Sequence, residues 1–66
     1  MKYTNYMIDL ITFYASINSF YINSGLYYHM KKDINTKSKD KYLHYYEKVK
    51  YFVDNNQLKI KVPELK

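Results

Sequence analysis

Side chains that could carry catalysis or hold a metal are few in this chain. It contains no cysteine, and its two histidines are His29 and His44. On a helix, Asp40, His44 and Glu47 would share part of one face, because they follow one another at spacings of four and three. A metal site needs further convergent ligands, so we interpret this group as a solvated helix face. The sequence predicts no enzyme, no metal and no cofactor.

Lysines interleaved with tyrosines offer a second kind of chemistry. Tyrosine rings can stack on bases while ammonium groups hold phosphates, a combination suited to single-stranded nucleic acid. The chain has no arginine, and therefore lacks the bidentate fork that reads base edges. Nucleic-acid binding is our alternative hypothesis for function. The residues that would carry it are Tyr27, Tyr28, Lys31, Lys32, Lys37, Lys39 and Lys41.

The abundance of tyrosine, with ten in 66 residues, has two explanations. Tyrosine supplies rigid, amphipathic contact area, which suits both a small core and an interface. Lysine, tyrosine, isoleucine and asparagine together make up half of the chain, and all four have A/T-rich codons. A low-G+C genome would produce the same bias without selection for tyrosine. Both explanations remain open.

The length allows one small domain, residues 1–66, with little room for a core. Such a chain buries only about 60% of the surface that its unfolded form exposes, so its stability alone is marginal. Without cysteine no disulfide can compensate, which favours association with a protein partner or with a second copy. Residues 31–66 hold the whole net charge of +5. This basic half could steer an anionic partner toward the chain.

The residues from Leu10 to Ile22 are mostly apolar and carry no charge, and the polar Asn23 follows them. This stretch is too short for a spanning helix, which needs about 20 apolar residues. We therefore do not expect a membrane protein. The absence of cysteine fits a reducing compartment, and we expect the chain in the cytoplasm.

A long first helix is predicted over about residues 3–23. Its apolar residues recur at alternating spacings of four and three, which is a heptad pattern. A second apolar strip contains Ile8, Ile11 and Ile22, so the helix is apolar around most of its girth. We predict that this strip contacts a partner. The heptad residues are Tyr3, Met7, Leu10, Tyr14, Ile17 and Tyr21.

Two further helices are predicted. Gly25 indicates a stop or kink, with glycine as a left-handed cap or as a tolerated residue in a longer helix. A short helical piece over about 26–32 and a basic loop over 33–39 follow. The last helix covers about 40–54, capped by Ser38 or Asp40 and ended by asparagines 55 and 56. Its apolar stripe is Tyr42, Tyr46, Val49 and Val53.

Beyond this helix the pattern alternates. Leu58, Ile60 and Val62 alternate with two lysines, which predicts a strand over about 58–62 that Pro63 ends. No second strand is predicted. This segment must therefore join another chain's sheet, pair with its own copy, or lie as an extended strap across the helices. We predict that its three aliphatic residues, like the strip on the first helix, bind a partner.

Together these patterns predict a mainly α fold. It is a small helical hairpin or bundle of two to three helices with one short C-terminal β-strand or extended strap, completed by dimerisation or a partner. The leading hypothesis for function is a small non-enzymatic protein-binding module. The A/T-biased composition is typical of low-G+C phages and mobile genetic elements, which suggests an inhibitor of a larger host or defence enzyme complex in the host cytoplasm.

Overall fold

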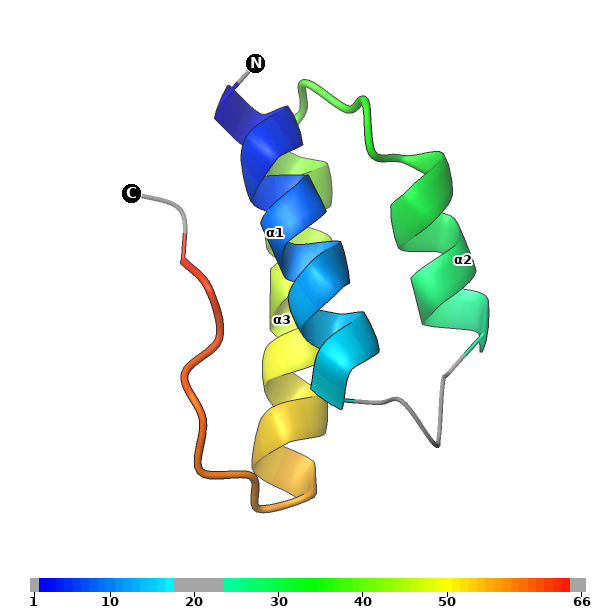
Figure 1. The fold of residues 1–66 in the computed structure, drawn as a ribbon. Coiled ribbons are helices and arrows are strands. Elements are labelled where there is room, and N and C mark those ends of the chain that lie inside the picture. Colours follow the sequence, from blue (N-terminus) through cyan, green and yellow to red (C-terminus); the bar gives the residue numbers. More distant parts are fainter. Residues whose placement is uncertain (1, 18–23, 65–66) are drawn as a thin grey trace.

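A computed structural model describes residues 2–17 and 24–64. These residues form a small three-helix bundle with an extended C-terminal segment (Figure 1). The helices are α1 (Lys2–Ile17), α2 (Ser24–Lys32) and α3 (Lys39–Asn55). The predicted mainly helical bundle is confirmed. The predicted continuation of the first helix over residues 18–23 lies outside the described residues.

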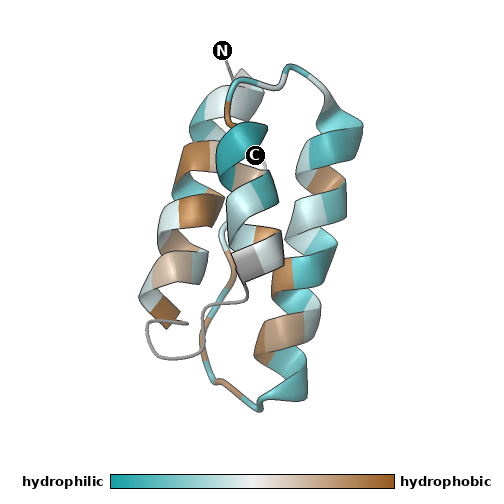
Figure 2. Ribbon diagram, turned by 90° about the vertical axis from the view of Figure 1, so that its right-hand side faces the viewer, coloured by the Kyte–Doolittle hydropathy of each residue, from teal (hydrophilic) through white to brown (hydrophobic). Residues whose placement is uncertain are grey.

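The α1–α3 pair forms the middle of the molecule. In Figure 1 α2 lies to the right of this pair, and the C-terminal segment lies to its left. Figure 2 views the molecule from the α2 side, with α1 and α3 behind it on either hand. The helix pair is thus covered on one side by α2 and on the other by residues 58–64, which we call the strap.

The core follows the predicted helical stripes. On α1 the heptad residues Met7, Leu10 and Tyr14 are buried, while Tyr3 and Ile17 are only partly buried. Tyr14 meets the Phe52 ring of α3 edge to face, with ring centroids 5.6 Å apart. Such aromatic pairs add about 0.5–1.5 kcal/mol to their area burial. The buried residues are Met7, Leu10, Ile11, Tyr14, Met30, Tyr42, Tyr45, Val49, Val53 and Val62.

One register detail of α3 differs from the prediction. Tyr45 is buried where the predicted stripe has Tyr46, which is only partly buried. Both positions fit a helical spacing with Tyr42 and Val49. The Tyr45 hydroxyl donates to Asp33 in the loop after α2, and the local pattern does not contain this long-range contact.

The start of α2 corrects one reading of Gly25. This glycine lies in the first turn of α2 and has a negative φ. It is therefore not the left-handed cap residue of the preceding helix. The last turn of α2 contains His29, Lys31 and Lys32. Cations in this position interact favourably with the negative end of the helix dipole.

The start of α3 has the predicted cap. Ser38 is the N-cap residue, and its side chain accepts a hydrogen bond from the backbone N–H of Lys41 at 3.4 Å. The Thr36 hydroxyl in turn accepts from the Ser38 N–H at 3.1 Å. Asp40 lies in the first turn, where a negative charge complements the helix dipole. The basic loop predicted over 33–39 therefore ends at residue 38, where the cap begins the helix.

The end of α3 differs from the prediction. The left-handed residue is Gln57, with φ of 56°, whereas Asn56 has φ of −100°. The Leu58 N–H donates to the Val53 carbonyl at 3.0 Å, and the Gln57 N–H donates to the Asp54 carbonyl at 3.1 Å. These two bonds define a Schellman motif, in which glycine usually occupies the left-handed position. The motif turns the chain back along the bundle.

The strand prediction is wrong within the described residues, because residues 58–62 form no ladder with another segment. The predicted alternative, an extended strap across the helices, is the observed arrangement (Figure 1). Alternating aliphatic residues favour a strand only where a neighbouring strand supplies hydrogen bonds. The dimer or partner expected to complete the fold stays a prediction. None of the helices in residues 2–17 and 24–64 is long and apolar enough to cross a membrane.

Candidate functional site

The strap carries three residues that the sequence predicts to bind a partner. Val62 is only 7% exposed and belongs to the core, so it fastens the strap to the bundle. Leu58 is 36% exposed and Ile60 is 45% exposed. Two of the three aliphatic side chains therefore remain accessible to a partner, and the third holds them in place.

The predicted apolar strip on α1 does not form one exposed patch. Ile11 is buried in the core, whereas Ile8 is exposed. Ile22, the third residue of the strip, lies outside the described residues. The bundle thus covers part of the surface that the sequence assigned to a partner, and the strap becomes the better candidate.

The backbone of the strap is held at two points and open between them. At one end the Leu58 N–H donates to the Val53 carbonyl. At the other end the Tyr42 hydroxyl donates to the Pro63 carbonyl at 3.2 Å. Between these bonds, the backbone groups of residues 59–62 make no hydrogen bond within the described part of the chain. Unpaired backbone of this kind is a template for pairing with another chain.

Tyr42 connects the strap to the core. Its ring is buried and lies 6.0 Å from the Tyr6 ring and 5.9 Å from the Tyr46 ring, centroid to centroid. Burial, followed by the neighbouring Tyr46 hydroxyl, raises the pKa of Tyr42 to about 12. The hydroxyl therefore stays protonated at neutral pH and remains the donor to Pro63.

A shallow groove lies between the strap and α3. It has a volume of about 180 Å³, and Ile60 and Val62 of the strap line it together with Tyr46 of α3. Lys50 and Asp54 of α3 also line this groove. The groove extends the accessible aliphatic surface of Ile60 toward the helix, so a docked side chain could contact both elements.

The five lysines of the nucleic-acid hypothesis lie at one end of the bundle. Lys31 and Lys32 belong to the last turn of α2, Lys37 to the connecting loop, and Lys39 and Lys41 to the first turn of α3. This end is at the top of Figure 1, where the green segment joins the two helices. The structure therefore brings these cations together, as phosphate binding requires.

The tyrosines of that hypothesis are less free than their sequence positions suggest. The Lys31 Nζ lies 5.4 Å from the Tyr27 ring centroid, and the Lys32 Nζ lies 5.6 Å from the ring centroid of Tyr28. Each ammonium group covers a ring face on which a base would stack. Tyr27 also packs against the core. The geometry thus favours contact with phosphates over stacking on bases.

Lys41 is engaged by an acidic residue that sequence reasoning missed. Its Nζ lies 3.0 Å from Asp33 Oδ1, and the Tyr45 hydroxyl donates to Asp33 Oδ2 at 2.5 Å. The hydrogen bonds from Tyr45 and Lys41 lower the pKa of Asp33. Burial and the bond to Asp33 raise the pKa of Tyr45 to about 12. We call this arrangement of Asp33, Lys41 and Tyr45 the Asp33 lock. It ties the loop after α2 to α3, and its carboxylate neutralises the charge of one of the five lysines.

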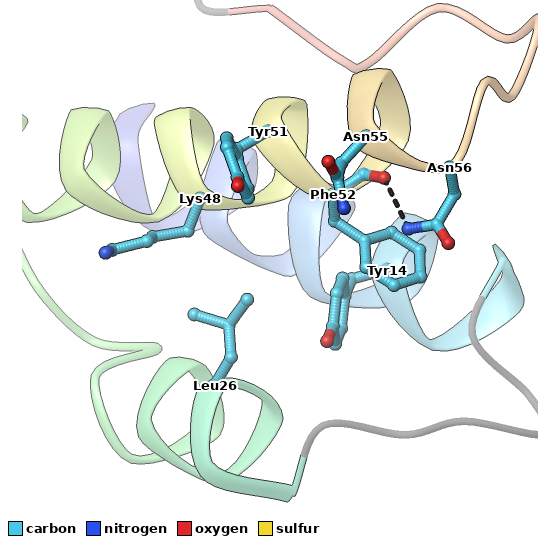
Figure 3. A pocket seen from close by; sticks show the side chains of 7 residues that line it. All are labelled: Tyr14, Leu26, Lys48, Tyr51, Phe52, Asn55 and Asn56. Atoms are coloured by element: carbon cyan, nitrogen blue, oxygen red, sulfur yellow. Dashed lines mark hydrogen bonds between the residues drawn. The ribbon is translucent and has the colours of Figure 1, made fainter.

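A larger groove, which the sequence did not indicate, lies between α2 and the C-terminal half of α3 (Figure 3). It has a volume of about 460 Å³. The rings of Tyr14 and Phe52 form its apolar wall, and the Asn56 side-chain amide donates to the Phe52 carbonyl at 2.8 Å. Its residues come from three helices, so no local pattern could reveal it. They are Tyr14, Leu26, Lys48, Tyr51, Phe52, Asn55 and Asn56.

The polar triplet considered as a metal site is spread over an exposed face of α3. Asp40, His44 and Glu47 are all exposed. Within residues 2–17 and 24–64, no three His, Asp or Glu side chains converge to hold a metal ion. The His44 ring instead meets the neighbouring Tyr45 ring, with centroids 5.1 Å apart.

In comparisons with known proteins, no family model, curated protein or solved structure matches this chain. Its function is therefore inferred from the geometry of the strap and of the basic end.

Proposed function

We propose that this chain is a small non-enzymatic protein-binding module whose strap lies in the interface with a larger partner. The observation that carries this proposal is the middle of the strap, where the backbone of residues 59–62 makes no hydrogen bond to residues 2–17 and 24–64 and Ile60 is 45% exposed. Because both ends of the strap are fastened to α3, this segment is ordered before it binds. Such preorganisation lowers the entropy cost of association.

The size of the chain bears on the mode of action. A standard interface buries about 800 Å² on each partner, and the chain exposes 4834 Å² in total. One such interface would cover about a sixth of this surface and would extend from the strap onto α3. Occupying a surface of a larger enzyme complex is the inhibitory mode that we propose for a chain of this size.

Capture from an extract of the source organism tests the proposal when matched variants are compared. Ile60→Asp places a charge on the exposed part of the strap, and Tyr51→Asp places the same charge on an exposed residue of α3. We expect a discrete partner to be retained by the wild type and by Tyr51→Asp but lost by Ile60→Asp. Retention of the same partner by Ile60→Asp would contradict the assignment of the strap.

The lysine cluster supports a second candidate function, which is contact with a nucleic-acid backbone. Its specific support is the gathering of residues 31–41 at one end of the bundle. Titration with a single-stranded oligonucleotide should show a dissociation constant that rises steeply with salt. Lys37→Glu and Lys39→Glu should weaken binding, whereas Tyr28→Leu should change it little. An absence of binding at low salt would remove this candidate.

A further inference from the structure

The strap has the dimensions of a strand without being one. Residues 58–62 would span about 17 Å at strand geometry, which is a usual strand length. In an extended segment, side chains two residues apart share a face. Val62 is buried, whereas Lys59 and Lys61 are exposed. Lys59 and Lys61 therefore share one side of the segment, and Lys61 also lines the groove between the strap and α3.

Charge disfavours a second copy of the strap as the pairing partner. In an antiparallel pair centred on Ile60, Lys59 of each copy would lie opposite Lys61 of the other. A shift by two residues places a lysine opposite the same lysine, and a shift by one places both lysines on the aliphatic face. Like charges directly opposite each other destabilise a strand pair. In-register parallel pairing would also bring the lysines side by side.

We infer that the strap pairs, by β-addition, with an extended acidic segment of the partner protein in which Asp or Glu alternates with aliphatic residues. This inference rests on the proposed function and names the partner surface. Acidic side chains of the added strand would lie opposite Lys59 and Lys61. Its aliphatic side chains would continue the surface of Leu58 and Ile60. Alternate residues of the segment 59–62 would gain ladder bonds, which no backbone group of this segment makes within residues 2–17 and 24–64.

The groove between the strap and α3 contains charges of both signs. Asp54 and Glu64 line it, and so does Lys61, whereas Lys59 is not among its lining residues. An acid of the added strand opposite Lys59 would therefore not enter this groove, and an acid opposite Lys61 would share that lysine with the groove's carboxylates. The added strand therefore needs acidic residues on the side of Lys59 and Lys61 and aliphatic residues on the side of Leu58 and Ile60. A segment in which the two kinds alternate provides both.

A short peptide provides the probe for this pairing. We would titrate the full chain with acetyl-Val-Glu-Val-Glu-Val-amide and follow the backbone amides by NMR. The expected result is a shift of the amides of residues 59–62, with slowed solvent exchange at alternate positions, either 59 and 61 or 60 and 62, because only alternate N–H groups face the paired edge. The peptide acetyl-Val-Lys-Val-Lys-Val-amide should bind on the order of tenfold more weakly, because attraction at the two charged positions becomes repulsion.

Two controls separate strand pairing from general attraction between charges. The peptide acetyl-Glu-Glu-Val-Val-Val-amide has the same charge without the alternation and should bind more weakly than the alternating peptide. In the double variant Lys59→Glu and Lys61→Glu, the preference should reverse toward the basic peptide. The inference fails if the acidic peptide leaves residues 59–62 unchanged, or if it perturbs the lysines of residues 31–41 equally.

Self-association is tested in the same sample. If residues 59–62 are protected from exchange without peptide, and sedimentation shows a dimer that Ile60→Asp abolishes, the occupant is a second copy and the inference is overturned. Failure of the inference is distinguishable from failure of the proposed function. A captured partner that is lost by Ile60→Asp supports the proposed function even if the acidic peptide does not bind.

Discussion

The loop after α2 and the strap after α3 are both lysine-bearing segments without regular structure, and they are fastened in opposite ways. The loop, residues 33–38, is held by the Asp33 lock, by the Ser38 cap and by a hydrogen bond from the Thr4 hydroxyl to the Thr36 carbonyl at 3.3 Å. The strap is fastened by buried Val62, and within the described residues its backbone is hydrogen-bonded only at its two ends. Several polar groups of the loop are thus paired within the chain, whereas the backbone groups of residues 59–62 make no hydrogen bond to any described residue.

This difference separates a structural connection from a surface that can accept a partner. A loop whose polar groups are paired has little to gain from a new contact, because each new bond would replace an old one. In an exposed segment without internal hydrogen bonds, a partner replaces only bonds to water. Substitutions in the loop should therefore act on folding, and those in the middle of the strap should act on binding.

The largest expected effect on the free energy of unfolding comes from Tyr45, which holds the loop through Asp33. Tyr45→Ala removes a buried ring together with the hydroxyl that holds Asp33, and it should cost about 3–5 kcal/mol of unfolding free energy. A chain of this length has a total stability of about 3–10 kcal/mol. We expect circular dichroism to show a largely unfolded or strongly destabilised protein. Tyr45→Phe, which keeps the ring, should retain the helices. A fully folded Tyr45→Ala variant would show that the loop is not essential to the bundle.

The second largest effect on the free energy of unfolding comes from substituting Asp33, and this effect depends on pH. Asp33→Asn should destabilise the chain at neutral pH by about 1–3 kcal/mol, because two charge-assisted bonds are weakened. The pKa of Asp33 is lowered from its ordinary value of 3.8 in the folded chain. Its contribution is therefore present above pH 3.8 and is lost as the pH falls through the lower folded pKa. Urea unfolding of both proteins over this range measures the difference.

Asp9→Asn is the matched control for that experiment, because Asp9 is exposed on α1. It should change the unfolding free energy by less than Asp33→Asn at neutral pH. If the difference in unfolding free energy between the wild type and Asp33→Asn stayed unchanged in acid, this would contradict the role of the carboxylate.

Substituting Val62, which fastens the strap to the core, should have a smaller effect on the free energy of unfolding. Val62→Ala removes buried aliphatic surface and should cost about 1–2 kcal/mol. Because Val62 fastens only the strap, the helices should remain, and NMR order parameters of residues 59–64 should fall. A cooperative loss of all three helices would show that the strap is as integral to the fold as the loop, which would remove the distinction between them.

The smallest expected effect is at the turn into the strap. Gln57 adopts φ of 56°, a conformation that glycine reaches without steric cost. Gln57→Gly should therefore raise the unfolding free energy by about 0.5–1 kcal/mol. Gln57→Ala keeps the Cβ atom and should change it little. A shift of the urea midpoint with an unchanged m-value would measure the gain, and destabilisation by glycine would contradict it.

Local patterns predicted the helices and most of the core. The heptad residues Met7, Leu10 and Tyr14 are buried, and so are Val49 and Val53 of the last helix. Helical periodicity is a strong signal, because one face of each helix must be apolar to pack. Ser38 as a cap was also readable, since serine before an apolar stripe is a common start of a helix.

Long-range contacts account for what the sequence did not predict. Asp33 and Tyr45 meet across the junction of two elements, and Met30 of α2 is buried in a core cluster that residues of α1 and α3 also form. The alternation of residues 58–62 predicted a strand because pattern reasoning has no way to see whether a neighbouring strand exists. In the candidate site, Leu58 and Ile60 are accessible as predicted, but Val62 and Ile11 are buried.

Tyr42 links the folding equilibrium of the chain to the equilibrium of partner binding. Its ring is part of the core and its hydroxyl holds the Pro63 carbonyl of the strap. A partner that recognises the strap in its fastened position binds only the folded chain, so binding and folding are thermodynamically linked. At a partner concentration 100 times the dissociation constant, this linkage adds about 2.7 kcal/mol to the apparent stability. For a chain with so small a core, partner abundance would then set how long the folded protein survives in the cell.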